Sequence, residues 1–485
     1  MSRQEQTGLA DEFAPILPGR GASDYERYLR TDDLLSLQKT PDERAHHDEL
    51  LFQVTHQSSE LWLKLAGEEI EAATAHLQAA ELLRDYLEPF GVECELYARV
   101  PERANLVARI PGRGEGPSLM LLSHTDTVLA DPAEWSVDPW SGELRDGCVW
   151  GRGALDMKGQ VAASAVAIAS LAREGFRPDG DLIFAATADE EMGEGVTYGL
   201  EWLCAEYPDA VRCDFAVNEG AGDRVELGGR VLYLCSSAEK RSSPFVLHVR
   251  GRSGHGSMPG IADNALVKAA GLIERLGAYA PEPVLIPEAE GFLDTAVDTV
   301  PSPDRALDLA RSIDPLAAEM VEPLLGMTVA PTMVSASQKR NVIPGRCEVT
   351  VDCRLLPGQT EDEADRVLRA WLGDGDYELE WRHGQGGTRS ELGTPLWVAI
   401  EGFVDRLEPG ARVAPICVAG FTDSHWLRKA FGTVAYGFFP LRAMSADFAA
   451  RLIHSADERI AVDDLELGVE FLRHVAVAVG EGAAA

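Results

Sequence analysis

SLMLLSHTDTV (118–128), GQVAASAVAIASLAREG (159–175) and DLIFAATADEE (181–191) decide the fold of this chain. The first and third segments open with short, continuous apolar runs, which are typical of strands buried on both faces of a parallel sheet. The segment between them is rich in alanine and long enough for a buried helix that crosses from one strand to the next. We therefore expect an open α/β sheet, whose ligands bind beyond the carboxyl ends of its strands.

Further segments extend this sheet. LVARI (106–110) and DFAVN (214–218) are predicted to be buried parallel strands, and FGTVAYGFF (431–439) returns to the same pattern after a long interruption. Within the interruption, the order strand-helix-strand-strand-helix-strand predicts a ferredoxin-like (βαββαβ) lid domain. The expected organisation is a mostly parallel α/β catalytic domain over 80–240 and 385–485, with a lid and dimerisation domain inserted at 241–384.

Length and composition restrict the class of protein. A chain of 485 residues is too long for one compact core, so two or three domains are expected. The formal charge of −35 repels phosphate backbones and argues against nucleic-acid binding. The polar N-terminus has no apolar signal core, no apolar run is as long as a bilayer span, and the eight cysteines are scattered. These features favour a cytoplasmic protein with free thiols and no membrane partner.

Acidic and imidazole side chains follow the predicted strands where each strand ends. They are His124 and Asp126 after the first strand, Glu190 and Glu191 after the third, and Glu219 after DFAVN. Asp156 opens the crossover helix after a Gly-rich turn. Unpaired carboxylates are costly at the edge of a buried sheet, so we expect a bound cation there. Imidazole and carboxylate ligands together suit zinc or a similar ion.

The spacing of these groups suggests a pair of metals. Two neighbouring metals need a bridging carboxylate, for which Asp156 is the candidate. The other expected ligands are His124 and Glu219 for one metal, and Glu191 and a histidine for the second. The local sequence leaves that histidine open between His425, in GFTDSH, and His454, in RLIHSADERI.

Two further residues are expected to act on the ligands and on water. Asp126 lies two residues after His124, on the same side of an extended chain, and can hold the second imidazole nitrogen. Glu190 points away from Glu191, which leaves it free to accept a proton from metal-bound water as a general base.

From about residue 80 to 480 the chain resembles the family of zinc aminoacylases, carboxypeptidase G and succinyl-diaminopimelate desuccinylase. The motifs SHTDTV, GRGALDMKG, ADEEMG, NEG, GRSGHGSMP, NVIPG to DCRLLPG, and RLIHSADERI occur in the family's order. The resemblance implies that His454 rather than His425 is the ligand, and that the Asp156–Met157 peptide is cis. It also implies hydrolysis of an amide bond next to a free carboxylate by a metal-bridging water.

The same resemblance implies residues that contact the substrate. His255, in the lid, matches a histidine that stabilises the oxyanion, often from the partner subunit of a homodimer. The expected substrate-binding residues are Asn341, Arg354, Thr422 and Asp423. A guanidinium fork suits a substrate carboxylate. Phe421 stands where the family usually has a second glycine, so the pocket is expected to differ there.

The segment SDYERYLRTDDLLSLQKTPDERAHHDELLFQVTHQSSELWLKLAGEEIEAA (23–73) resembles instead the N-terminal segment of tryptophan 2,3-dioxygenase. In that family, the positions matching Phe52 and His56 line the indole pocket. The rest of the dioxygenase has no counterpart, so no haem is expected. We expect a flexible tail over 1–23 and a helical extension over 24–79, acting as an oligomerisation element, a wall of an aromatic pocket, or a fusion relic.

The sequence thus predicts a dinuclear-zinc hydrolase that cleaves an amide bond of a peptide or N-acyl amino acid bearing a free carboxylate. Cobalt or manganese are alternative metals. A pocket shaped by the dioxygenase-like segment would favour a tryptophan- or kynurenine-type substrate. The expected partners are a small-molecule or short-peptide substrate and a second copy of the chain. The alternatives are a dipeptidase or aminopeptidase, and a non-catalytic binding or assembly protein on a hydrolase fold.

Overall fold

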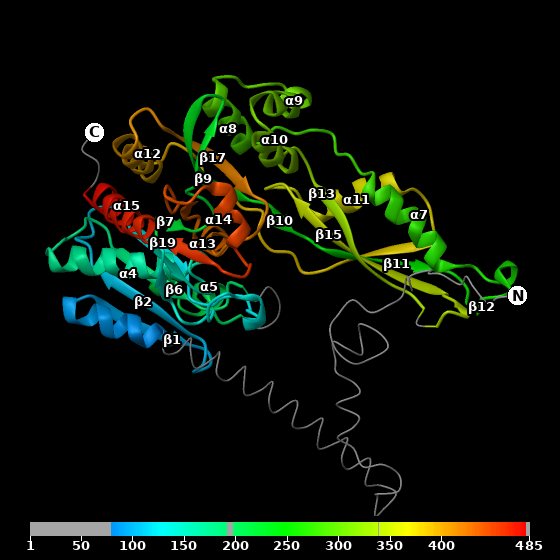
Figure 1. Cartoon of the computed structure of the whole chain (residues 1–485), viewed down its shortest axis with the longest axis horizontal. Helices are drawn as coiled ribbons and strands as arrows, with labels where there is room; N and C mark the ends of the chain where they lie inside the picture. The colour runs from blue at the N-terminus through cyan, green and yellow to red at the C-terminus, as the bar shows by residue number, and fades with distance from the viewer. Residues whose placement is uncertain (1–78, 192–196, 338, 482–485) are drawn as a thin grey trace, which may run out of the picture. The chain divides into compact units, whose positions relative to one another are not determined.

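A computed structural model describes residues 79–191, 197–337 and 339–481 (Figure 1). The expected tail, the helical extension up to residue 78 and the dioxygenase-like segment lie outside these residues. No helix in the described part of the chain is both long enough and apolar enough to cross a membrane.

The largest element is a sheet of nine strands, in the order β1-β2-β6-β3-β7-β18-β9-β17, with β8 paired to β9. The strands are β1 (Glu93–Ala98), β2 (Ala104–Ile110), β3 (Leu119–His124), β6 (Leu182–Thr187), β7 (Phe215–Asn218), β8 (Arg224–Leu227), β9 (Arg230–Glu239), β17 (Arg412–Val418) and β18 (Val434–Gly437). β3 runs parallel to both β6 and β7, and β7 runs parallel to β18. The predicted α/β class with a largely parallel sheet is confirmed.

The prediction for LVARI was wrong in one respect. β2 pairs antiparallel with both β1 and β6, so it is a buried strand of the opposite direction. All but one of its residues are buried, which explains the apolar run. Burial on two faces produces such a run in a strand of either direction, so the sequence pattern could not distinguish them.

Helices cover both faces of the large sheet. α4 (Lys158–Arg173), α12 (Pro395–Leu407) and α15 (Val462–Gly480) share one hydrophobic cluster with the sheet. α5 (Leu200–Glu206), α6 (Pro208–Val211) and α13 (Ser424–Phe431) share a second cluster. Because side chains of β2, β3 and β6 contribute alternately to the two clusters, these clusters lie on opposite faces of the sheet.

The lid is a second sheet with its own core. Its elements follow the order β10 (Arg241–Ser242), β11 (Phe245–Arg250), α7 (Ala265–Gly277), β13 (Thr328–Ser335), β15 (Arg346–Leu355), α11 (Glu361–Leu372) and β16 (Tyr377–Trp381). β15 pairs with β10, β11 and β13, and β11 pairs with β16, all antiparallel. α7 and α11 pack on this sheet, so the strand-helix-strand-strand-helix-strand order of the lid agrees with the sequence prediction.

Three helices inside the range 241–384 pack away from the lid core. α8 (Pro287–Val297), α9 (Pro303–Ile313) and α10 (Pro315–Val321) share a cluster with β8, β9 and β17 of the large sheet. The chain therefore passes between the large sheet and the lid four times, after β9, after α7, before β13 and after β16. An amphipathic helix pattern shows that a face is buried but does not show against which sheet, so the sequence did not indicate this division.

Candidate metal centre

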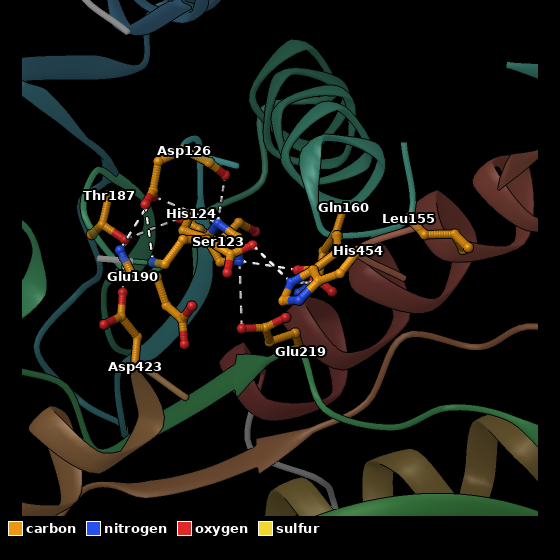
Figure 2. A network of polar contacts seen from close by, with 12 residues as sticks. Ser123, His124, Asp126, Leu155, Gln160, Thr187, Glu190, Glu219, Asp423 and His454 are labelled. Atoms are coloured by element: carbon orange, nitrogen blue, oxygen red, sulfur yellow. Dashed lines mark hydrogen bonds and ion pairs between the residues drawn. The ribbon is translucent and has the colours of Figure 1, made fainter. Parts of the chain in front are cut away.

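The carboxyl ends of three neighbouring parallel strands meet at one rim of the large sheet. β3 ends at His124, β6 is followed by Glu190 and Glu191, and β7 is followed by Glu219. Because β3 lies between β6 and β7, these side chains converge as the strand order predicts. Figure 2 shows His124, Glu190 and Glu219 at this rim.

Two groups of possible metal ligands share Asp156. The first comprises His124, Asp156 and Glu219, and the second comprises Asp156, Glu191 and His454. In the first, Nε2 of His124 lies 3.2 Å from Oδ1 of Asp156 and 3.5 Å from Oε1 of Glu219. In the second, Nε2 of His454 lies 3.0 Å from Oδ2 of Asp156 and 3.1 Å from Oε1 of Glu191. The two oxygens of Asp156 thus face different histidines, as a bridging carboxylate would.

His454 and Asp156 come together through a small sheet that is remote in sequence. β19 (Arg459–Ala461) pairs with β5 (Cys148–Trp150), which pairs with β4 (Glu143–Arg145). This pairing brings the segment after α14 (Ala446–Leu452) beside the turn that carries Asp156. His454 has a left-handed backbone (φ 59°), and the Asp156–Met157 peptide is cis, as the family resemblance implies.

The competing histidine is held elsewhere. Nδ1 of His425 lies 3.6 Å from Oε1 of Glu239, and the His425 ring packs on the rings of Phe421 and Trp426. His425 belongs to neither ligand group.

The donor atoms of the two groups are arranged for binding a metal rather than for hydrogen bonding to one another. Nε2 of His124 is buried and has no hydrogen-bond partner, although it faces two carboxylates. Each group combines one imidazole with two carboxylates, and the donor atoms of each group lie within 4.8 Å of one another. Imidazole nitrogen and carboxylate oxygen are common zinc donors, so this cluster fits zinc.

Electrostatics reinforce this interpretation. Burial, with Glu219 nearby, raises the pKa of the Glu190 carboxyl well above its usual range. Burial and the Asp156 carboxylate raise the pKa of Glu191 to about 7. Burial alone would lower the pKa of His124, but Glu219 and Asp156 raise it well above its usual value. Without metal, Glu190 and Glu191 therefore keep their protons to higher pH than exposed carboxyls do. The pKa of Asp156 is lowered, because His124 and His454 outweigh the effect of its burial. A bound cation would favour the ionised form of all three carboxyls.

The metal-stripped protein is expected to lose stability as the pH rises from about 4.5 to about 7. Glu191 and Asp423, whose pKa values both rise to about 7 on folding, bind protons in the folded state that the unfolded state has released. The free energy of unfolding therefore falls with pH in this window. Urea titrations at a series of pH values, with chelator and with two equivalents of zinc, measure this. A metal-stripped protein whose stability rises or stays constant through this window would contradict the expectation.

Asp126 holds its neighbours differently from the expectation. Nδ1 of His124 donates to the backbone carbonyl oxygen of Asp126 at 3.0 Å, while the carboxylate lies 3.6 Å away. The carboxylate instead accepts the backbone N–H groups of Glu190 and Glu191, at 3.2 and 3.0 Å. Asp126 thus orients the imidazole with its main chain and the Glu190–Glu191 turn with its side chain. The turn follows Asp189, whose backbone is left-handed (φ 81°).

Glu458 was missed as a site residue. Its carboxylate is fully buried and accepts from the backbone N–H groups of Leu155 and Asp156, at 2.8 and 3.1 Å, and from Nη1 of Arg152 at 2.7 Å. It therefore fixes the turn that carries Asp156 from the segment that carries His454. No local pattern marks Glu458, because Leu155 and Asp156, whose N–H groups it accepts, lie about 300 residues away in the sequence.

Glu458→Gln is expected to weaken zinc binding by about 10- to 100-fold, the usual loss when a group that orients a ligand is removed. The substitution keeps the size of the side chain but removes the charge that pairs with Arg152, and it replaces one accepting oxygen by an NH2 group that would face a donor. Competition with a chromogenic chelator measures the affinity. Glu408→Gln, which removes one of the two carboxylate charges that pair with Arg224, away from the metal centre, is the control and should bind zinc as the wild type does. Equal affinities in the two variants would exclude this role for Glu458.

The loop after β17 also reaches the centre. Oδ2 of Asp423 accepts a hydrogen bond from Oγ1 of Thr187 at 2.9 Å (Figure 2). Thr422 is buried and lies 3.4 Å from Oε2 of Glu239 through its Oγ1. Phe421 packs on His425 and Trp426, so its ring helps hold this loop.

The predicted lid residues divide into two places. His255 is exposed on β12 (Gly254–His255), which pairs with β14 (Val342–Ile343), and the carbonyl of Asn341 accepts from the N–H of Gly256. His255 and Asn341 are therefore neighbours. Arg354 lies on β15, where its guanidinium binds the carboxylate of Asp352 with two hydrogen bonds of 2.9 Å. In the described residues, no hydrogen bond or ion pair joins these three side chains to the ligand groups.

Histidine and carboxylate donors gathered at the rim of an α/β sheet define the class of metal-dependent hydrolases. Residues 120–478 match the model of peptidase family M20/M25/M40, and the chain belongs to this family of zinc-dependent hydrolases. The chain is 27% identical over 409 residues to succinyl-diaminopimelate desuccinylase of Cereibacter sphaeroides, covering 80% of this chain and 90% of the relative. It is 28% identical over 382 residues to human N-fatty-acyl-amino acid synthase/hydrolase PM20D1, covering 74% of each.

Solved structures show the same fold. An M20 family metallo-carboxypeptidase, Sso-CP2 from Sulfolobus solfataricus, matches with a TM-score of 0.61 and 18% identity, over 83% of this chain and 93% of that one. Human carnosine dipeptidase 1 matches with a TM-score of 0.57 and 14% identity, over 88% and 98%.

Proposed function

We propose that this protein is a two-zinc hydrolase that cleaves the amide bond of an N-acyl amino acid or short peptide with a free carboxylate. The observation that carries the proposal is the placement of Asp156, whose two carboxylate oxygens face two different histidines. The names of two relatives, the desuccinylase and the N-fatty-acyl-amino acid synthase/hydrolase, both refer to N-acylated amino groups. This supports an N-acyl substrate.

The proposed ligands are His124, Asp156 and Glu219 for one zinc, and Asp156, Glu191 and His454 for the other. Bound zinc would polarise the amide carbonyl and make water acidic enough to attack it at neutral pH. Asp126 and Glu458 would hold the two turns that carry the ligands in place.

Glu190 would act as the general base and then as the general acid. Its backbone N–H is fixed by the Asp126 carboxylate, and its side chain belongs to neither ligand group. Burial raises the pKa of Glu190, which suits a group that accepts a proton from water and returns it to the leaving amine.

The lid would supply the substrate contacts. His255 would stabilise the oxyanion, as an imidazole donor does, and Asn341 beside it would help to orient the substrate. Arg354 would bind the substrate carboxylate, for which it would exchange its present partner Asp352. Thr422 and Asp423 would line the pocket from the large sheet.

A substrate panel on the zinc-loaded protein tests the function, with release of free amine as the measurement. The panel contains N-succinyl, N-acetyl and N-fatty-acyl amino acids, dipeptides, and acylated tryptophan beside acylated glutamate. Hydrolysis of an N-acyl amino acid supports the proposal, and a preference for tryptophan supports an aromatic pocket. Two bound zinc ions with no amine from any substrate would favour the non-catalytic alternative, and cleavage of dipeptides alone would favour a dipeptidase.

A homodimer through the lid is part of the proposal. β13 pairs only with β15 among the described residues, so it is an edge strand, and it exposes Met333 (69%) and Val334 (55%). Unpaired apolar edges associate with other chains. The purified protein is expected to have the mass of a dimer by light scattering, and Met333→Lys with Val334→Lys should give a monomer. Leu144→Lys, at an exposed apolar position on β4, is the control and should leave the mass unchanged. A monomeric wild type would exclude this dimer.

The proposed location is the cytoplasm. All eight cysteines are free thiols, and five of them are buried. Unpaired cysteines in this number fit a reducing compartment.

A further inference from the structure

Two charged residues are buried where the chain first leaves the large sheet for the lid. Glu239 ends β9 with 1% of its surface exposed, and Lys240, the next residue, has 0% exposed. Neither belongs to the proposed metal centre. Buried charges are costly unless they are paired, so their contacts show what they hold together.

The Glu239 carboxylate joins three separate segments of the chain. Oε1 accepts from Oγ1 of Thr388 at 2.5 Å, in the segment by which the chain returns from the lid. Oε2 lies 3.4 Å from Oγ1 of Thr422 and 3.3 Å from Nη1 of Arg428, in the loop after β17 and the helix that follows it. One side chain thus connects the end of β9, the returning segment (385–390) and the loop after β17 (419–423), which is called the substrate loop below.

The end of β9 and the returning segment (385–390) are joined directly by backbone hydrogen bonds. The N–H of Glu239 donates to the carbonyl of Thr388 at 3.1 Å, and Ser242 exchanges two backbone hydrogen bonds with Gln385, at 2.8 and 3.0 Å. Gly386 has a φ of +86°, and a Cβ there would lie 2.6 Å from the carbonyl oxygen of Lys240, so only glycine fits this close approach.

Lys240 holds a third passage between sheet and lid. Its ammonium donates to the carbonyl oxygens of Pro323 and Gly326, at 2.7 and 3.0 Å, and to Oγ1 of Thr328 at 3.2 Å. These residues connect α10 to β13. Glu239 and Lys240 are adjacent in the sequence, and they bind two other chain segments that connect the large sheet to the lid.

The substrate loop is fastened at both ends. Asp423 binds Thr187 beside the metal ligands, and Thr422 is the adjacent residue that faces Glu239. The N–H of Lys240 also donates to the carbonyl of Val418 at 2.8 Å, at the start of the loop. A displacement of the returning segment at Thr388 would therefore be transmitted through the Glu239 carboxylate to Thr422.

We propose that Glu239 is a positioning residue for hydrolysis, which sets the substrate loop according to how the lid is attached. The inference rests on the proposed function, because the loop lines the pocket only if the metal centre is the active site. Glu239 touches neither substrate nor reacting atoms and acts through Thr422. A carboxylate that served folding alone would affect stability but not the binding of substrate by the folded enzyme.

Thr388→Val tests the proposal without touching the loop or the Glu239–Arg428 ion pair. It removes the hydroxyl that donates to Glu239 and keeps the side-chain volume. The expected result is a KM for the N-acyl amino acid raised about 10-fold, with kcat changed less than about 3-fold and two zinc ions still bound. Thr388→Ser, which keeps the hydroxyl, should restore the wild-type KM.

A double-mutant cycle shows whether the effect passes through the loop. Thr422→Val alone should raise KM by a similar factor. The double variant Thr388→Val with Thr422→Val should raise KM no further, because each substitution breaks the same path from Thr388 through Glu239 to Thr422. Independent, multiplying effects of the two substitutions would overturn the proposal, as would an unchanged KM in Thr388→Val.

Hydrogen exchange gives a measurement that does not depend on turnover. In Thr388→Val, amides of residues 419–425 should exchange about 10-fold faster than in the wild type, while amides of β3 and β6 stay protected. Glu239→Gln should do the same where it folds. Unchanged exchange in the loop would overturn the inference even if the wild type hydrolysed no substrate. A wild type without activity would overturn the proposed function separately.

Discussion

Glu190→Gln is expected to lower kcat by about 100- to 10,000-fold, the usual contribution of a general acid–base group. Glutamine has nearly the same shape, and its backbone N–H keeps the hydrogen bond to Asp126. It cannot accept the proton of the attacking water, however, so the chemical step fails while the site remains assembled. Turnover of the best substrate, measured beside zinc content, tests this.

The control for Glu190→Gln is zinc stoichiometry rather than activity alone. Glu190 belongs to neither ligand group, so the variant should retain two zinc ions per chain and the wild-type melting temperature. Glu408→Gln again serves as the matched variant, with kcat unchanged. Activity within about 10-fold of the wild type would show that another residue moves the proton. Loss of a zinc ion would show that Glu190 is a ligand.

Asp156→Asn is expected to reduce the zinc content from two ions to one or none and to abolish turnover. An amide has one oxygen and no charge, so it cannot serve His124 and His454 together as the two carboxylate oxygens do. The loss in zinc affinity should exceed the approximately 100-fold limit for groups that only orient a ligand. Metal analysis after dialysis against a known free-zinc concentration measures it.

Asp126→Asn is a comparison variant that distinguishes a metal ligand from a residue that only positions ligands. The single amide oxygen of this variant could still accept one of the two N–H groups that the Asp126 carboxylate holds, so zinc should be bound, although more weakly. If Asp156→Asn retained two zinc ions while Asp126→Asn lost them, the bridge would be misassigned.

Most of the residues of the candidate metal centre could be predicted, because their positions depend on strand ends. Buried strands are visible as apolar runs, and the residue after each run is placed at the rim by the geometry of a parallel sheet. His124, Glu191 and Glu219 needed no more than this. The α/β class and the order of the lid elements followed from local patterns in the same way.

The remainder of the centre depends on contacts that no local pattern encodes. His454 reaches Asp156 only because β19 pairs with β5, and this pairing joins segments about 300 residues apart in the sequence. Its choice over His425 needed the family resemblance. Glu458 was missed for the same reason, since its partners Leu155 and Asp156 are equally remote.

The expectations for Asp126 and for the lid failed at finer detail. Spacing placed Asp126 beside His124 correctly, but it could not show that the carbonyl oxygen, rather than the carboxylate, accepts from the imidazole. The helices α8 to α10 have apolar faces that either sheet could bury, and they pack on the large one. The identity of the substrate is the feature that the sequence predicts least well, because the proposed pocket is formed by loops rather than by strand ends.

The position of β18 in the large sheet has a consequence for how the chain folds during synthesis. This strand lies inside the sheet, between β7 and β9, yet it consists of residues 434–437. A ribosome therefore makes β7, β9 and the whole lid before the strand that separates β7 from β9 exists. Until then, the nascent sheet has two unpaired inner edges, which are sites for aggregation. We expect the sheet to be completed only after residue 437 has emerged from the ribosome, so that these edges stay unpaired during the synthesis of the lid.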